Sequence, residues 1–218
     1  APFITSRICG LCPIAHYLCS LSAIENAFKI KISEEITDLR KILLSAQIIK
    51  SHLLHLFFLV LPDFAGLKGG IELTKKYPAE FHLMLNLKRV VDNILETISG
   101  SATFPVNPII GSFINFPANE KLLAIRDLIF EVIDEAQDLI KLFASFEIPE
   151  LNVQTKLVTI RSLTKSYPYY SGKFPEKIKE IVRNDSPAKL GILENGEIIK
   201  VGALSRMFYF SEFLQNPL

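Results

Sequence analysis

The chain has 218 residues, of which 49% are hydrophobic and 22% are charged, and its formal net charge is +1. This composition supports a large hydrophobic core and excludes an intrinsically disordered chain. A near-neutral charge without a dense basic patch argues against nucleic-acid binding, and three cysteines are too few for a disulfide scaffold.

Helical periodicity dominates residues 1–150. Ser33 is a suitable N-cap, followed by Glu34 and Glu35 in a first turn where the helix dipole favours anions. Gly100 is a suitable residue just past a helix end, and 101–117 carries three prolines and no periodicity, which predicts a loop. Four helices are predicted, the second and fourth long and central, at about 13–28, 33–61, 79–98 and 119–146.

The last third of the chain changes character. Asn195-Gly196 lies between two β-type runs, 190–193 and 197–201, and Asn-Gly in this position is a strong hairpin signal. The predicted fold is therefore mainly α: a bundle of long helices over 1–150, with a small β-hairpin-containing appendage over 151–218 that belongs to the same domain.

The first residues and the longest apolar stretch bear on the cellular compartment of the protein. The first residues show no secretory signal and no initiator Met, which suggests an excised or processed chain. The longest apolar stretch, 53–61, is shorter than the roughly 20 residues of a membrane span. Clustered cysteines indicate metal or redox chemistry in a reducing compartment, so we expect a cytoplasmic protein without a membrane span.

The residues best suited to bind a metal lie in the N-terminal segment. Cys9 and Cys12 form a Cys-x-x-Cys pair that can place two thiolates on one metal, and Gly10 between them permits positive φ or a close backbone approach. Pro13 disfavours helical geometry at Cys12 and starts the helix after it. The helix N-terminus and the charge of Arg7 then favour the thiolate form, which binds metal.

Other interpretations of the same cysteines stay open. Two buried structural cysteines, or a redox-active pair, are possible, although redox pairs are expected beside a βαβ pattern. A zinc site that used the helical face of Cys12, His16 and Cys19 is disfavoured, because seven helical residues span roughly 10.5 Å and two zinc-bound sulfurs are at most about 4.6 Å apart. Cys19, and the histidines His52 and His55 on the apolar second helix, are therefore expected in the core, with the histidine rings hydrogen-bonded there.

The motif Arg-x-Cys-Gly-x-Cys-x-x-x-His is satisfied by Arg7, Cys9, Gly10, Cys12 and His16. It resembles the N-terminal metal-binding signature of nickel–iron hydrogenase large subunits. Looser likenesses over 51–64 and 199–206, the first of them to the cytoplasmic multisubunit branch, extend the resemblance over nearly the whole chain.

The resemblance implies roles for these residues. Cys9 would be a terminal nickel ligand and Cys12 would bridge nickel and iron, while His16 would hydrogen-bond near the bridging sulfur. Arg7 and Gly10 would lie beside the ligands. The complete parent would catalyse the reversible oxidation of H2 to protons and electrons at a nickel–iron centre. The electrons would leave through iron–sulfur clusters of a small-subunit partner.

Three departures from the family follow. Its second cysteine pair and its upstream proton-relay carboxylate are not in this chain, so we expect a fragment that is inactive alone, lacks the nickel–iron centre and self-associates through exposed apolar surface. The loop before the fourth helix reads Asn107-Pro108 and Gly111-Ser112 where relatives tend to have His-Pro and Gly-Gly. The alternative function is a structural zinc-binding or scaffold module that uses Cys9 and Cys12.

Overall fold

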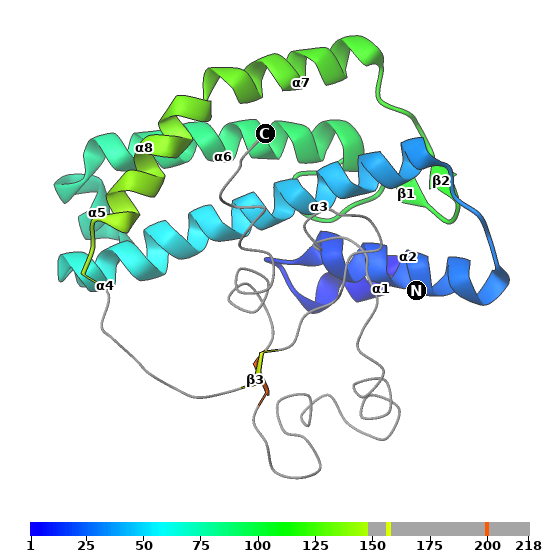
Figure 1. Ribbon diagram of the computed structural model, residues 1–218, viewed down its shortest axis with the longest axis horizontal. Helices are drawn as coiled ribbons and strands as arrows, with labels where there is room; N and C mark the ends of the chain where they lie inside the picture. The colour runs from blue at the N-terminus through cyan, green and yellow to red at the C-terminus, as the bar shows by residue number, and fades with distance from the viewer. Residues whose placement is uncertain (148–155, 158–198, 201–218) are drawn as a thin grey trace. The chain divides into compact units, whose positions relative to one another are not determined.

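The computed structural model describes residues 1–147, 156–157 and 199–200. The chain divides into two compact units, Ala1–Glu147 and Ile148–Leu218, and the first is mainly α-helical, as predicted (Figure 1). Its α-helices in chain order are α1 (Pro2–Thr5), α2 (Pro13–Phe28), α3 (Glu34–His55), α4 (Leu61–Ala65), α5 (Gly70–Lys76), α6 (Pro78–Ser99), α7 (Asn119–Glu131) and α8 (Ile133–Ala144). A 3-10 turn, η1 (Ser6–Ile8), precedes the cysteine motif, and a π-helical segment, η2 (Leu56–Val60), joins α3 to α4.

The long helices α3 and α6 lie side by side at the centre of this unit (Figure 1). Helix α2 packs against α3, while α7 and α8 pack against α6. The side chains between the central helices are almost fully enclosed: Leu43 on α3 and Met84, Leu95 and Ile98 on α6 expose 2% or less of their surface. Helix α2, whose start carries the cysteine motif, therefore packs on one of the two central helices.

The predicted fourth helix is not one long central helix. It breaks at Val132, whose φ of −107° and ψ of 3° leave the helical region, and its two halves lie outside α6. Ile125, Val132 and Leu139 are all buried and seven residues apart. The apolar repeat therefore runs unchanged through the break, and periodicity alone gave no sign of it.

The predicted second helix, 33–61, begins with α3 as predicted, and the helical stretch continues through η2 and α4 to Ala65, past the predicted end. The Ser33 side chain accepts a hydrogen bond from the Ile36 N–H at 3.3 Å, as an N-cap should. Near the far end the Leu61 N–H donates to the Leu56 carbonyl, a π-type bond, just ahead of Pro62. Proline lacks an N–H and crowds the carbonyl four residues back. A local switch to hydrogen bonds that reach five residues back lets the helix continue past it.

The continuous helical stretch Glu34–Ala65 is 32 residues long and apolar enough to cross a membrane on length and composition alone. Core helices of soluble proteins have the same property. Here this stretch lies between α2 and α6, and it carries the buried polar residues Arg40 and Gln47.

The predicted loop at 101–117 contains a small hairpin. Strands β1 (Pro108–Ile109) and β2 (Ser112–Phe113) pair antiparallel, with Pro108 opposite Phe113, and Gly111 makes the turn with a φ of +73°. In the second unit, β3 (Lys156–Leu157) pairs in parallel with β4 (Ile199–Lys200). Apart from β3 and β4, the hairpin and appendage predicted over 151–218 lie outside the described residues.

Candidate metal centre

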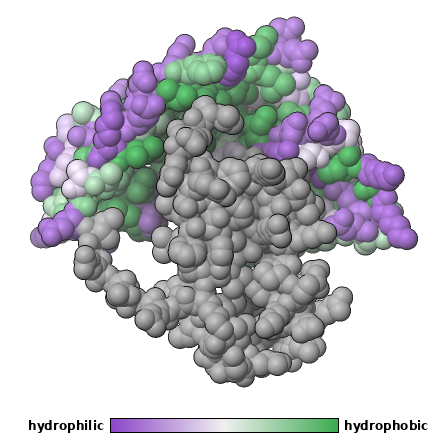
Figure 2. Space-filling model, viewed as in Figure 1, coloured by the Kyte–Doolittle hydropathy of each residue, from purple (hydrophilic) through white to green (hydrophobic). Residues whose placement is uncertain are grey.

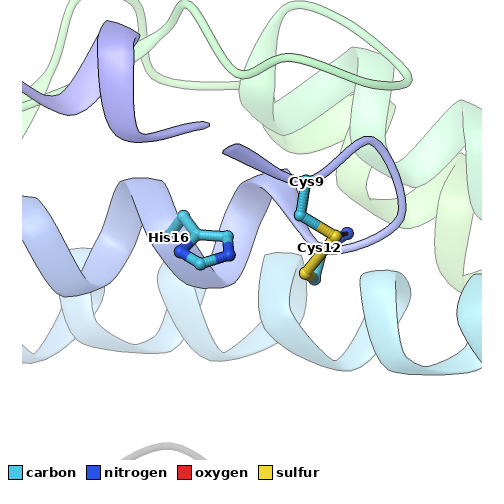
Figure 3. Close-up of side chains that lie close together, drawn as sticks. All are labelled: Cys9, Cys12 and His16. Carbon is cyan, nitrogen blue, oxygen red and sulfur yellow. Dashed lines mark hydrogen bonds between the residues drawn. A yellow bond between two sulfur atoms is a disulfide. The ribbon is translucent and has the colours of Figure 1, made fainter. Parts of the chain in front are cut away.

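The two cysteines of the motif lie in a short loop between η1 and α2. Cys9 is extended, with φ −141° and ψ 124°, and Cys12 is the N-cap of α2, with φ −126° and ψ 38°. Pro13 at the first helical position thus keeps Cys12 out of the helix, as predicted. The Cα atoms of the cysteines are 5.4 Å apart and their sulfurs are joined as a disulfide (Figure 3).

A third donor lies beside the sulfurs. His16 is one helical turn beyond Cys12 on α2 (Figure 3), and a ring nitrogen of His16 and the two Sγ atoms all lie within 4.8 Å of one another. All three side chains are half-buried, so they are held by the fold yet reachable. After reduction the loop presents two soft thiolates and an imidazole, donors that suit nickel, iron or zinc, and these residues therefore fit a transition-metal centre.

The backbone supports negative charge on sulfur at this loop. The Cys12 N–H donates to Cys9 Sγ at 3.2 Å. Cys12 is also the N-cap of α2, where the free N–H groups give a positive dipole end. A thiolate at Cys9 therefore has a hydrogen-bond donor built into the loop.

Two polar residues outside the motif position α2. The Gln47 side chain on α3 accepts a hydrogen bond from the Ala15 N–H at 3.1 Å, satisfying a free donor in the first turn of α2. Thr5 Oγ1 donates to the His16 carbonyl at 3.3 Å and so ties α1 to α2. The sequence did not reveal these roles; its one available signal was a polar Gln47 among apolar neighbours. In the structure Gln47 is only 6% exposed.

Arg7 and Gly10 fit the motif differently from expectation. Arg7 is exposed, donates from Nη1 to the Phe3 carbonyl at 2.6 Å and stacks 5.1 Å from the centre of the Phe104 ring. Gly10 does not have positive φ, and a Cβ placed there would meet nothing within 4 Å. The predicted close backbone approach at Gly10 is therefore absent from the described part of the chain.

Three further expectations were wrong. Cys19 is an exposed free thiol and not a core residue, because the face of α2 that carries it is not the one packed on α3. His52 and His55 are exposed as well, because the buried stripe of α3 passes through Leu53 between them. An apolar neighbourhood in the sequence did not indicate which side of the helix these residues occupy.

A buried ion pair fixes α2 to α3. Arg40, fully buried, donates from its two terminal nitrogens to both carboxylate oxygens of Glu25 at 2.8 and 2.7 Å. Glu25 also accepts from the Gly111 N–H at 2.7 Å, and Arg40 donates to the Ile109 carbonyl at 3.1 Å. Burial raises the pKa of Glu25, but the hydrogen bonds from Arg40 and Gly111 and the charge of Arg40 outweigh it, so its pKa lies below the ordinary value.

The hairpin loop is held by Asn107 and Tyr17. The Asn107 amide donates to the carbonyls of Ile98 and Asn115 at 2.8 Å each and accepts from the Asn115 N–H at 2.9 Å. Tyr17 donates from its hydroxyl to the Pro108 carbonyl at 2.8 Å. Burial raises the pKa of Tyr17 against an opposing effect of Arg40. Asn107 thus fills a structural role in this loop.

Comparison with known proteins identifies relatives of one kind. The profile of the family described as nickel-dependent hydrogenase matches residues 1–82, which include the cysteine motif. The chain is 29% identical to the alpha subunit of sulfhydrogenase 1 from Pyrococcus furiosus, over 97% of this chain and 52% of that protein. It is 34% identical to the alpha subunit of sulfhydrogenase 2 from the same organism, over 67% of this chain and 35% of that protein.

A solved structure shares the fold. An NAD+-reducing [NiFe]-hydrogenase in the H2-reduced state superposes with a TM-score of 0.62 at 18% identity, covering 66% of this chain and 34% of that one. The chain thus spans about half or less of the length of these relatives. Residues 1–82 thus match the nickel-dependent hydrogenase family, and sequence similarity to the large (alpha) subunits of hydrogenases extends over most of the chain.

Proposed function

We propose that the protein containing this chain is a nickel–iron hydrogenase that oxidises H2 reversibly to two protons and two electrons, and that Cys9 and Cys12 are two of its metal ligands. The observation that supports this most is the position of the pair. Its sulfurs lie together at the N-terminus of α2, inside the segment that matches the family.

The residues of this chain would have different roles at the metal centre: ligation, hydrogen bonding and positioning. A bound nickel–iron group would supply the redox chemistry. Cys9 and Cys12 would hold it as thiolates, helped by the Cys12 N–H at the Cys9 sulfur. A ring nitrogen of His16 lies within 4.8 Å of both sulfurs, and His16 would donate a hydrogen bond to one of them in the loaded centre. Gln47 keeps the first turn of α2 in place. Arg7 and Gly10 line the loop without contributing a ligand.

The partner follows from the family resemblance, and the cysteine count of these residues agrees with it. Iron–sulfur clusters need several cysteine ligands, and 218 residues with three cysteines, two of them committed to the centre, leave only Cys19. We therefore propose that an iron–sulfur small subunit accepts the electrons, and that the assembly is cytoplasmic. By itself the 218-residue chain would be inactive, because it supplies two of the four thiolates that the family resemblance implies.

Viologen reduction by H2 tests the proposal in the complete, assembled hydrogenase. The variants Cys9→Ser and Cys12→Ser should each reduce the rate to background, because a serine hydroxyl does not replace a soft thiolate ligand. Cys19→Ser, which removes an exposed thiol on the same helix, should leave the rate unchanged. Full activity in Cys12→Ser, or an assembled protein that contains zinc in place of nickel, would refute the proposal and favour a structural zinc site.

A further inference from the structure

We propose that Gln47 of α3 acts as an external cap for helix α2, and that it occupies the Ala15 N–H so that this donor does not bond to the Cys12 sulfur. Gln47 is then a positioning residue that limits how many hydrogen bonds this sulfur receives. The inference deepens the proposed function and rests on it, because the number of hydrogen bonds matters where Cys12 is a metal ligand.

The start of α2 places backbone donors close to the Cys12 sulfur. The first N–H groups of a helix have no partner within it, and the side chain of the N-cap residue ordinarily accepts from the second or the third of them. The N-cap here is Cys12, and Pro13 at the first helical position has no N–H. The Ala15 N–H, at the third position, is therefore a donor that the Cys12 side chain could accept.

Gln47 accepts this donor from outside the helix. Its side-chain oxygen accepts a hydrogen bond from the Ala15 N–H at 3.1 Å, across 32 positions of sequence, and Cys12 makes no side-chain capping bond. Because the amide nitrogen of glutamine is only a donor, the atom that faces Ala15 is Oε1. Gln47 thus does for α2, from another helix, what the N-cap Ser33 does for α3.

Burial strengthens the contact between Gln47 and Ala15. Gln47 is 6% exposed, so water competes weakly for its oxygen, and a buried polar group that loses its partner carries a desolvation penalty. Helix α3, which carries Gln47, also packs against α6. The acceptor is therefore anchored in the central helices of the unit rather than in the cysteine loop itself.

The hydrogen bonds at a thiolate affect the metal that it binds. Each N–H that bonds to the sulfur draws electron density from it and favours the more reduced state of the metal. With the Ala15 N–H bonded to Gln47, the side-chain donor beside Cys12 is His16, whose ring nitrogen lies within 4.8 Å of its sulfur (Figure 3). Gln47 therefore leaves more of the electron density of the Cys12 sulfur for the metal.

Redox titration of the complete, assembled hydrogenase, followed by the electron paramagnetic resonance of nickel, tests this role. Gln47→Leu removes the acceptor and frees the Ala15 N–H for Cys12, so the midpoint potential should rise by about 59 mV, a tenfold change in the one-electron equilibrium. Gln47→Glu keeps an acceptor oxygen and adds negative charge, so its midpoint should be native or lower. Ile94→Val on α6, at a position 5% exposed, has a similar expected cost in stability and should leave the midpoint native.

Nickel content is measured on the same samples and should stay stoichiometric in every variant, because no thiolate is removed. With nickel present in the native enzyme, a native midpoint in Gln47→Leu, an equal rise in Gln47→Glu or Ile94→Val, or loss of nickel from Gln47→Leu would overturn this inference alone. A native enzyme without nickel would refute the proposed function and this inference with it.

Hydrogen exchange resolved to single amides tests the cap in the native enzyme without any variant. The Ala15 amide should be protected from exchange, because its hydrogen is bonded to a buried oxygen. Exchange at the rate of an open amide would show that Gln47 does not hold this donor, and would overturn the inference whatever the midpoint potentials are.

Discussion

At the scale of single residues, the buried ion pair of Arg40 and Glu25 ties α2, the helix that follows the cysteine motif, to α3. Arg40 is fully buried and Glu25 is 4% exposed, so neither charge is solvated by water. Each is compensated by the other and by the hairpin groups of Ile109 and Gly111. Removing one partner therefore leaves an uncompensated buried charge.

We predict that Glu25→Met lowers the free energy of unfolding by about 3–5 kcal/mol, the usual cost of breaking a buried pair. The double variant Glu25→Met with Arg40→Met should be less destabilised than the single one, because no charge stays buried. As a matched control, Asp127→Ala breaks an ion pair that is 58% and 61% exposed and should cost under about 1 kcal/mol. Urea denaturation measures all three, and a double variant worse than the single one would contradict this account.

The low pKa of Glu25 predicts a pH dependence of stability. The folded carboxyl binds its proton more weakly than the unfolded one, so its contribution is complete above the unfolded pKa of about 4.3 and is lost as the pH falls through the lower folded pKa. Asp92 acts in the same direction. Burial raises its pKa, but its hydrogen bonds and ion pairs with Lys50 and Lys88 lower it by more. The free energy of unfolding should fall below about pH 4.3, and less steeply in Glu25→Gln. Equal slopes would be inconsistent with the ion-pair geometry.

The sequence predicted which side chains cluster at the start of α2 better than it predicted the residues that hold them in place. Cys9, Cys12 and His16 could be named because fixed spacing on a helix start brings them together regardless of tertiary context. Gln47 and Glu25 could not, because their partners are 32 and 86 residues away in the chain. Exposure of Cys19 likewise depends on which face of α2 meets α3, a fact that only the packing supplies.

At the scale of elements, helix ends were predictable where a local residue sets them. Helix α2 begins at Pro13 and ends at Phe28 as predicted, and α6 ends before Gly100, which has a φ of +79°. The break at Val132 and the short helix α5 carry no such marker. Lys29 closes α2 with a φ of +56°, an unusual choice that the bonds from Lys29 and Ile30 back to α2 support.

Two glycines that end helices test whether single local residues set the helix ends. Both Gly66 and Gly100 have left-handed φ, +63° and +79°, but a Cβ at Gly66 would meet nothing within 4 Å, whereas at Gly100 it would lie 2.8 Å from Val106 Cγ2. Gly66→Ala should cost about 1–2 kcal/mol from conformation alone, and Gly100→Ala about 1 kcal/mol or more beyond that from crowding. Thermal or urea unfolding measures the difference, and equal costs would mean that the loop yields freely.

At the scale of the whole molecule, Ala1–Glu147 leaves much apolar surface uncovered by described residues. Figure 2 shows a band of hydrophobic side chains on the face in view, with hydrophilic ones at its outer edge. Around the cysteine motif Ile4, Ile8 and Leu11 are 76%, 69% and 61% exposed. Large apolar side chains grouped beside the cysteine loop indicate a surface that another chain or segment covers.

We predict that the 218-residue chain self-associates through the exposed apolar surface of Ile4, Ile8 and Leu11. Sedimentation velocity over a concentration series should show reversible growth in mass, because burying apolar surface is favourable. The triple variant Ile4→Ser, Ile8→Ser, Leu11→Ser should reduce it, while Ile140→Ser, a 68% exposed position on α8, should not. A monomer at every concentration would rule out this use of the surface.

The most direct test of the central claim, that Cys9 and Cys12 hold the metal of a nickel-dependent hydrogenase, is nickel quantification in the assembled protein. Elemental analysis of the complete hydrogenase should find stoichiometric nickel in the native protein and in Cys19→Ser, and none above background in Cys9→Ser or Cys12→Ser. Because all three variants remove one thiol from the same short segment, the contrast isolates ligation from general damage. Stoichiometric nickel in Cys9→Ser or Cys12→Ser would contradict the assignment of these residues as ligands.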